Sequence, residues 1–110
     1  MVGYDGSDAS ARALDVAADL VGYGSTLDVV TVRTSELDDS TADARERLRR
    51  RLVEAGYHET TGEPARQFVK KAHELRADLL VIGRRAGSTS LGSVSSKVVR
   101  RAHCDVLVVR

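Results

Sequence analysis

One glycine-rich segment combines residue types that could hold a phosphate group. It reads GRRAGSTSLGSVSSKVVRR, from Gly83 to Arg101, and it separates an apolar run at 77–83 from a helical pattern that starts near Ser93. The backbone amides of Gly92, Ser93 and Val94 would open that helix as unpaired donors, at its partially positive end. Gly83, Gly87 and Gly92 would let the backbone approach a ligand closely, and serine hydroxyls add donors.

Two interpretations of this segment stay open. Neither common phosphate fingerprint, GxGxxG or GxxxxGK[ST], is present, and an ordinary connection between a strand and a helix also favours glycine and serine. Arg84 and Arg85 follow Gly83 directly, where they could neutralise phosphate charge or simply face solvent.

Asp5 is a second candidate, because it ends the first apolar run and could accept hydrogen bonds from a sugar hydroxyl. A nucleophilic role for Ser7 is not supported, since nothing places a base beside it. His58, His73 and His103 lack metal-ligand spacing, and Cys104 has no CxxC partner. The sequence therefore favours binding over catalysis.

The elements that must position these residues alternate along the chain. Strands are predicted near 1–5, 27–32, 57–61, 77–83 and 105–110, the third being polar and short, with helical patterns between them. Such alternation predicts one α/β domain over residues 1–110, with a five-stranded parallel sheet in the order 3-2-1-4-5 and helices on both faces. The apolar runs at 77–83 and 105–110 are typical of strands covered on both sides.

Each helical pattern has a start signal and an apolar face. Ser7 or Asp8 caps the first helix, Ser40 opens the second, Pro64 suits the first turn of the third, and Ser93 starts the fourth. The inward residues are predicted to be Ala13, Leu14, Ala17 and Val21 in the first, then Ala44, Leu48, Leu52 and Ala55 before a stop at Gly56, then Phe68, Val69 and Ala72, and finally Val94, Val98 and Ala102.

The composition and charge of the chain argue against nucleic-acid and membrane partners. The chain has 110 residues and a net charge of +1, so no global field favours nucleic acid. The arginine-rich run at 45–51 is interpreted as a solvated helix face, because aromatic residues for base stacking are absent nearby. No run approaches a membrane span, no secretion signal opens the chain, and one cysteine excludes an internal disulfide. We expect a cytoplasmic protein with neither membrane nor nucleic-acid partner.

Three blocks of the sequence resemble the universal stress protein family. They are YDGSDASARALDVAADL, GEPARQFVKKAHELRADLLVIGRR and GSVSSKVVRRAHCDVLVVR, which together cover nearly the whole chain in the family's order. The resemblance implies a Rossmann-like fold of the adenine nucleotide alpha hydrolase type, a role in stress-response regulation, ATP binding in many members, and homodimers.

The family's ATP-binding motif is matched only in part. Gly83 matches the first glycine and Gly92–Ser93 the last pair, but Ala86 stands at the middle glycine, with Gly87 one place later, and the spacer to Gly92 is about four residues shorter. The resemblance assigns Asp5, Val32 and Ile82 to the nucleoside, and Val94 to the position after the phosphate-binding pair.

The expected ligand is thus an adenine nucleotide, ATP first, which Mg²⁺ could accompany although no second acidic ligand is evident in the sequence. Hydrolysis of ATP should be slow at most, because no general base is visible. The alternative is a homodimeric interaction module of the same fold that no longer binds nucleotide. In either case the apolar edge strand at 105–110 is predicted to pair with its own copy.

Overall fold

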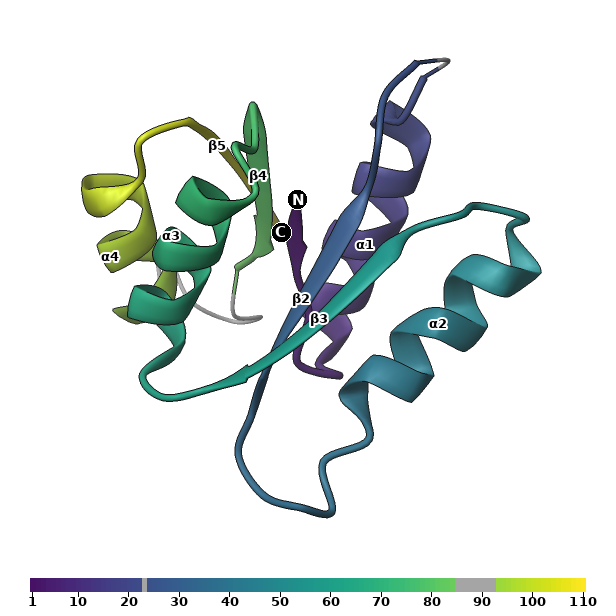
Figure 1. Cartoon of the computed structure of the whole chain (residues 1–110), viewed down its shortest axis with the longest axis horizontal. Helices are drawn as coiled ribbons and strands as arrows, with labels where there is room; N and C mark the ends of the chain where they lie inside the picture. The colour runs from purple at the N-terminus through teal and green to yellow at the C-terminus, as the bar shows by residue number, and fades with distance from the viewer. Residues whose placement is uncertain (23, 85–92) are drawn as a thin grey trace.

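The chain forms a five-stranded parallel sheet with helices on both faces (Figure 1). The computed structural model describes residues 1–22, 24–84 and 93–110. The strand order is β3-β2-β1-β4-β5 and each neighbouring pair is parallel, which confirms the predicted topology. The elements are β1 (Val2–Gly3), α1 (Asp8–Leu20), β2 (Asp28–Arg33), α2 (Ser40–Arg50), β3 (Gly56–Thr61), α3 (Pro64–Glu74), β4 (Leu79–Gly83), α4 (Ser93–Arg101) and β5 (Asp105–Val109).

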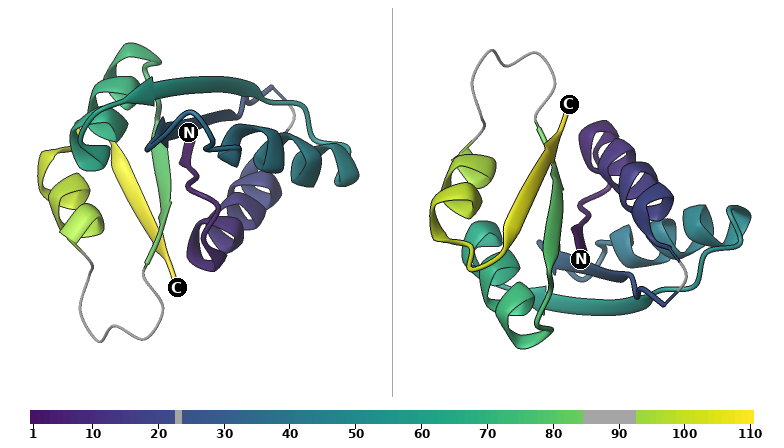
Figure 2. Two further views of the ribbon diagram at one scale, coloured as in Figure 1. Left: turned by 90° about the horizontal axis from the view of Figure 1, so that it is seen from below. Right: turned by 90° about the horizontal axis from the view of Figure 1, so that it is seen from above.

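The helices divide into two layers with the sheet between them. Figure 2 shows α1 and α2 on one face of the sheet and α3 and α4 on the other. Each layer covers a separate apolar cluster. The first includes Val2, Tyr4, Leu14, Val29, Leu48 and Val81, and the second includes Val30, Val32, Phe68, Leu80, Ile82 and Val98.

The alternation of side chains along β1 decides which of its residues point to each face of the sheet. Successive side chains of a strand point to opposite faces. Val2 and Tyr4 pack in the cluster under α1 and α2, whereas a side chain at Gly3 would point at Phe68 of α3. Asp5 continues the Gly3 face beyond the carboxyl end of the strand, and so faces the α3 side of the sheet.

Capping residues place the helix starts. Ser7 is the N-cap of α1 and its hydroxyl accepts a hydrogen bond from the Ser10 backbone at 3.2 Å. Gly6, between Asp5 and Ser7, has a φ of +86°, which a side chain would disfavour in this tight turn. In α3, Glu63 caps the helix through Arg66 N–H and Pro64 occupies the first turn, as predicted.

The predicted end of α2 is wrong. The helix stops at Arg50, and Leu52 takes a left-handed φ of 57° with 92% of its surface exposed, so it is not an inward residue. Gly56 does not stop the helix either, because it is already the first residue of β3. Val53 and Ala55 pack against the core instead, and they carry the apolar pattern beyond the helix.

The two edge strands also differ from expectation. β3 is polar, yet it pairs with β2 over six residues and is as long as β2 itself. β5 pairs with β4 but is not covered on both sides, since Leu107 keeps 38% of its surface exposed. Edge position explains both results: polar side chains are tolerated where one flank meets solvent, and an apolar run does not guarantee burial there.

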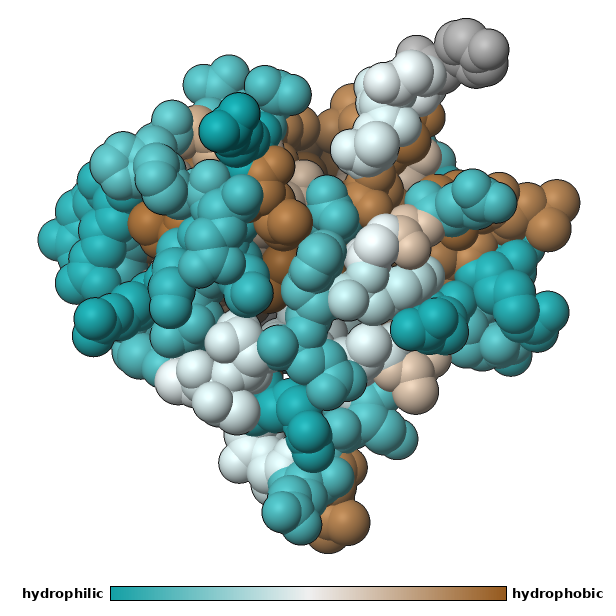
Figure 3. All heavy atoms as spheres, in the orientation of Figure 1, coloured by the Kyte–Doolittle hydropathy of each residue, from teal (hydrophilic) through white to brown (hydrophobic). Residues whose placement is uncertain are grey.

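The charged residues of α2 pair with one another, and Arg51, directly after the helix, pairs with α1. Arg49 and Arg50 contact Glu46, Arg47 contacts Asp43, and Arg51 reaches Asp15 and Asp19. Figure 3 shows that hydrophilic side chains also dominate the visible surface of α3 and α4. Within the described ranges, no helix has the length and apolar character needed to cross a bilayer.

Candidate functional site

A cavity of about 490 Å³ lies at the carboxyl ends of β1, β2 and β4. This is the place where strand order reverses, because β1 is followed by β2 on one side while β4 lies on the other. Its volume is within the range of small-ligand pockets. The lining residues are Gly3, Asp5, Ser7, Asp8, Ala9, Ser10, Val32, Thr34, Pro64, Phe68, Ile82, Gly83, Val94 and Ser95.

Five residues predicted for the site line this cavity together. They are Asp5, Val32, Ile82, Gly83 and Val94, which come from four separate segments of the chain. Ser93 is the first residue of α4. Arg85, Gly87 and Gly92 lie outside the described residues, so their predicted contacts stay predictions.

Sequence reasoning missed several lining residues, although simple periodicity could have found them. Thr34 stands two residues after Val32, and Gly3 two residues before Asp5, as the alternation of a strand requires. Pro64 and Phe68 are one helical turn apart on the same face of α3. Ser10 and Ser95 were not singled out because a buried serine has no distinctive pattern in sequence.

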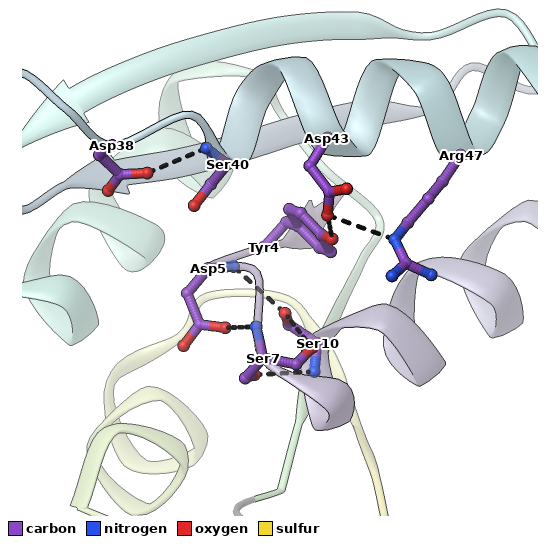
Figure 4. A network of polar contacts seen from close by, with 8 residues as sticks. All are labelled: Tyr4, Asp5, Ser7, Ser10, Asp38, Ser40, Asp43 and Arg47. Atoms are coloured by element: carbon purple, nitrogen blue, oxygen red, sulfur yellow. Dashed lines mark hydrogen bonds and ion pairs between the residues drawn. The ribbon is translucent and has the colours of Figure 1, made fainter.

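Asp5 is held in a compact turn in front of α1 (Figure 4). Its Oδ1 accepts a hydrogen bond from Ser7 N–H at 2.9 Å, and its own backbone N–H donates to Ser10 Oγ at 3.2 Å. Burial raises the pKa of this carboxyl, but hydrogen bonds from Ser7 and Ser10 outweigh that effect and the net pKa is lowered. Asp5 is therefore an ionised, accepting group at neutral pH.

Gly83 has a packing role that the sequence did not indicate. A Cβ at this position would lie 2.4 Å from the carbonyl carbon of Ala9 and 2.7 Å from Ser10 N, which are backbone atoms that cannot move aside easily. The glycine thus lets β4 touch the first turn of α1 and closes one wall of the cavity. On the other side, Ser95 Oγ donates to the Gly83 carbonyl at 3.3 Å and ties in α4.

The rim of the cavity carries two carboxylates. Asp8, in the first turn of α1, lines the cavity together with Asp5. The sequence analysis did not single out Asp8, and whether it could serve as a second acidic ligand for Mg²⁺ stays a prediction. Among the described residues, no group of three or more His, Cys, Asp or Glu side chains is arranged to hold a metal ion.

The histidines lie away from this cavity and in two different settings. His58 Nε2 is 2.9 Å from Asp28 Oδ1, across β3 and β2. The rings of His73 and His103 are in contact, with centroids 5.4 Å apart, although the two residues are distant in sequence. None of the three lines the cavity, where the polar side chains of the described lining residues are carboxylates and hydroxyls.

A buried tyrosine anchors α2 on the opposite face of β1. Tyr4 donates its hydroxyl to Asp43, which also contacts Arg47 at 3.3 Å (Figure 4). Burial, followed by the hydrogen bond to Asp43, raises the pKa of Tyr4 to about 12. The hydrogen bond from Tyr4 in turn lowers the pKa of Asp43.

Comparison with known proteins decides the family. The model of the universal stress protein family matches residues 1–110. The chain belongs to the universal stress protein family. It is 34% identical to a universal stress protein of Mycobacterium tuberculosis, over 99% of this chain and 93% of that protein. The alignment runs over 138 positions, which exceeds the 110 residues here, so the relative has segments without a counterpart in this chain.

Solved structures agree with the fold of this universal stress protein. A universal stress protein crystallised in complex with cAMP superposes with a TM-score of 0.83 at 30% identity, over 99% of this chain and 93% of that one. A universal stress protein from Archaeoglobus fulgidus superposes with a TM-score of 0.85 at 28% identity, over 99% of this chain and 90% of that one.

Proposed function

We propose that this universal stress protein binds an adenine nucleotide, with ATP as the first candidate, in the cavity at the carboxyl ends of β1, β2 and β4. The observation that carries the proposal is the pairing of an apolar floor with an ionised acceptor. Val32, Phe68 and Ile82 line the floor, and Asp5 stands at the rim. The apolar floor suits the flat ring of a base, and the ionised carboxylate suits a sugar hydroxyl or an exocyclic amine as hydrogen-bond donor.

The phosphate end of the ligand is assigned to α4. Its N-terminus begins at Ser93, and Val94 and Ser95 line the cavity, which supports a role for its first backbone amides as phosphate donors. The cAMP complex of the relative at 30% identity supports an adenine nucleotide as the ligand. Mg²⁺ is proposed only as a companion of the phosphates. Asp5 and Asp8 are the carboxylates that could hold it, and it would neutralise phosphate charge there.

The wider role is a regulator in the cytoplasm that works as a homodimer through β5. In this role, occupancy of the cavity by nucleotide would be the signal. The second candidate function is an interaction module without nucleotide. The shorter 83–92 spacer and the missing segments relative to the curated relative favour it.

A thermal-shift titration with ATP, ADP, AMP and cAMP separates the two functions. A ligand that binds only the native state should stabilise it by ~2.7 kcal/mol at ~100 times its dissociation constant. We expect the melting temperature to rise in a saturable way with at least one of the four. A melting temperature that does not respond to millimolar concentrations of any of them would favour the interaction module.

A further inference from the structure

Phe68 is the aromatic wall of the cavity. It keeps only 7% of its surface exposed and is the one aromatic side chain among the described lining residues. The undescribed stretch 85–92 contains no aromatic residue either, as its sequence shows. Any aromatic contact that this site offers to a flat ligand ring must therefore come from Phe68.

Gly3 makes room for this ring on the sheet. A Cβ at position 3 would lie 2.9 Å from Phe68 Cε1, closer than real Cβ contacts come, and 3.0 Å from Cζ, so the ring would have to shift. Because Gly3 also lines the cavity, the Phe68 ring lies across the backbone of β1 at the cavity floor. Any larger residue at position 3 would push the ring away from β1.

The helix that carries Phe68 is fixed at its first turn. Glu63 caps α3 through Arg66 N–H at 3.1 Å and also contacts Lys97 at 3.6 Å and Arg101 at 4.0 Å, both on α4. Pro64, one turn before Phe68, lines the same cavity. The ring is therefore held by two contacts: the ring packs against β1 at Gly3, and its helix α3 is joined to α4 through Glu63.

We propose that Phe68, positioned by Gly3, contacts the base of the bound nucleotide and determines the preference for ligands that carry a flat ring. This inference rests on the proposed function, because it names the part of the ligand that the site reads. Contact between a base and an aromatic side chain contributes about 10- to 100-fold in affinity. Phe68 acts on the base alone, so its removal should affect nucleoside and nucleotide equally.

Calorimetric titration with adenosine and with AMP tests this. Phe68→Leu keeps an apolar side chain, and we expect it to weaken both ligands by the same factor, about ten-fold or more. Val69→Ala is the matched control, because Val69 is the next residue of α3, packs against the same apolar cluster and does not line the cavity. It should leave both affinities within two-fold.

The possible results separate this inference from the proposed function. If the wild type binds no adenine ligand, the proposed function fails and the role of Phe68 fails with it. If the wild type binds and Phe68→Leu binds equally well, or loses affinity for AMP but not for adenosine, only the role of Phe68 is overturned.

A double-mutant cycle tests the positioning by Gly3 without any ligand. Gly3→Ala should lower the melting temperature strongly in the wild-type background, because its methyl group meets the Phe68 ring. In the Phe68→Leu background the same change should cost less, since the narrower side chain can give way. Additive effects of the two substitutions would show that Gly3 does not position the ring.

Discussion

Asp5 makes a structural contact, and the proposed function gives the same carboxylate a contact to the ligand. One oxygen accepts the hydrogen bond from Ser7 N–H that shapes the turn before α1. The lowered pKa keeps the carboxylate ionised, so its second oxygen can accept from a ligand. Removing the group should therefore affect both the turn and the ligand.

We expect Asp5→Ala to weaken adenine nucleotide binding by ~1–3 kcal/mol, because a hydrogen bond to a charged group is lost. Asp5→Asn is the informative comparison, since it keeps an oxygen for Ser7 N–H and removes only the charge. Calorimetry on both folded variants measures the effect. An unchanged affinity in Asp5→Ala would remove Asp5 from the site.

Tyr4 offers a test of how α2 is fastened to the sheet. Tyr4→Phe should destabilise the fold by ~1–2 kcal/mol at neutral pH, because the charge-assisted bond to Asp43 is lost. The folded-state pKa of Tyr4 is raised, so its contribution is complete below pH 10 and is lost as pH rises toward about 12.

Urea unfolding of wild type and Tyr4→Phe at pH 7 and at pH 11 measures both effects. The difference in unfolding free energy between the two proteins should shrink at pH 11, where the unfolded tyrosine of the wild type is ionised. A difference that stays constant or grows would contradict the assigned pKa direction.

The lining residues of the cavity could be predicted where they stand at strand ends or at the start of α4, but not where they come from the face of α3. Asp5, Val32 and Gly83 each end a recognisable apolar run, and the topology then brings them together. Phe68 was interpreted as a core residue, which it is, but a core position on α3 can also border a cavity. Sequence periodicity reports the buried face and cannot show where that face leaves space.

The backbone of β4 lies in close contact with the first turn of α1 at Gly83. Gly83→Ala should destabilise the protein by ~1–3 kcal/mol through overpacking against the Ala9 backbone. Gly22→Ala is its control, because an added Cβ there meets nothing within 4 Å and the backbone is not left-handed. Denaturant melts of the two variants should differ by that amount. Equal stability would mean that β4 can move away from α1 without cost.

The sequence pattern predicted the order of the strands but not the end of α2. Strand order followed from alternation, because right-handed crossovers leave few arrangements of five parallel strands. The end of α2 did not follow, since Leu52 continues the helical spacing in sequence while the chain turns at that residue into a left-handed conformation. The spacing of apolar residues predicts which face of a helix is buried. It does not predict where the helix ends when no glycine marks the C-terminal turn.

At the scale of the whole molecule, β5 is an edge strand that pairs with no other strand than β4 among the residues that the structure describes. We expect a homodimer in which two β5 strands pair antiparallel, because this satisfies their free backbone groups and covers Leu107. Light scattering after size exclusion should give a dimer for the wild type and a monomer for Leu107→Lys. Leu52→Lys, exposed at 92% and outside β5, should remain a dimer. A monomeric wild type at tens of micromolar would refute this assembly.

The position of the two-residue strand β1 at the centre of the sheet governs how this protein must fold. Val2 pairs with Val29 on one side and with Val81 on the other, so the middle of the sheet cannot close until a segment nearly eighty residues downstream arrives. Such long-range pairing slows folding, so we expect refolding to take longer than the microseconds of proteins with mostly local contacts. A stopped-flow refolding trace completed within microseconds would contradict this. During vectorial synthesis, the nascent chain must therefore leave β1 open on its β4 side until most of the sequence has emerged.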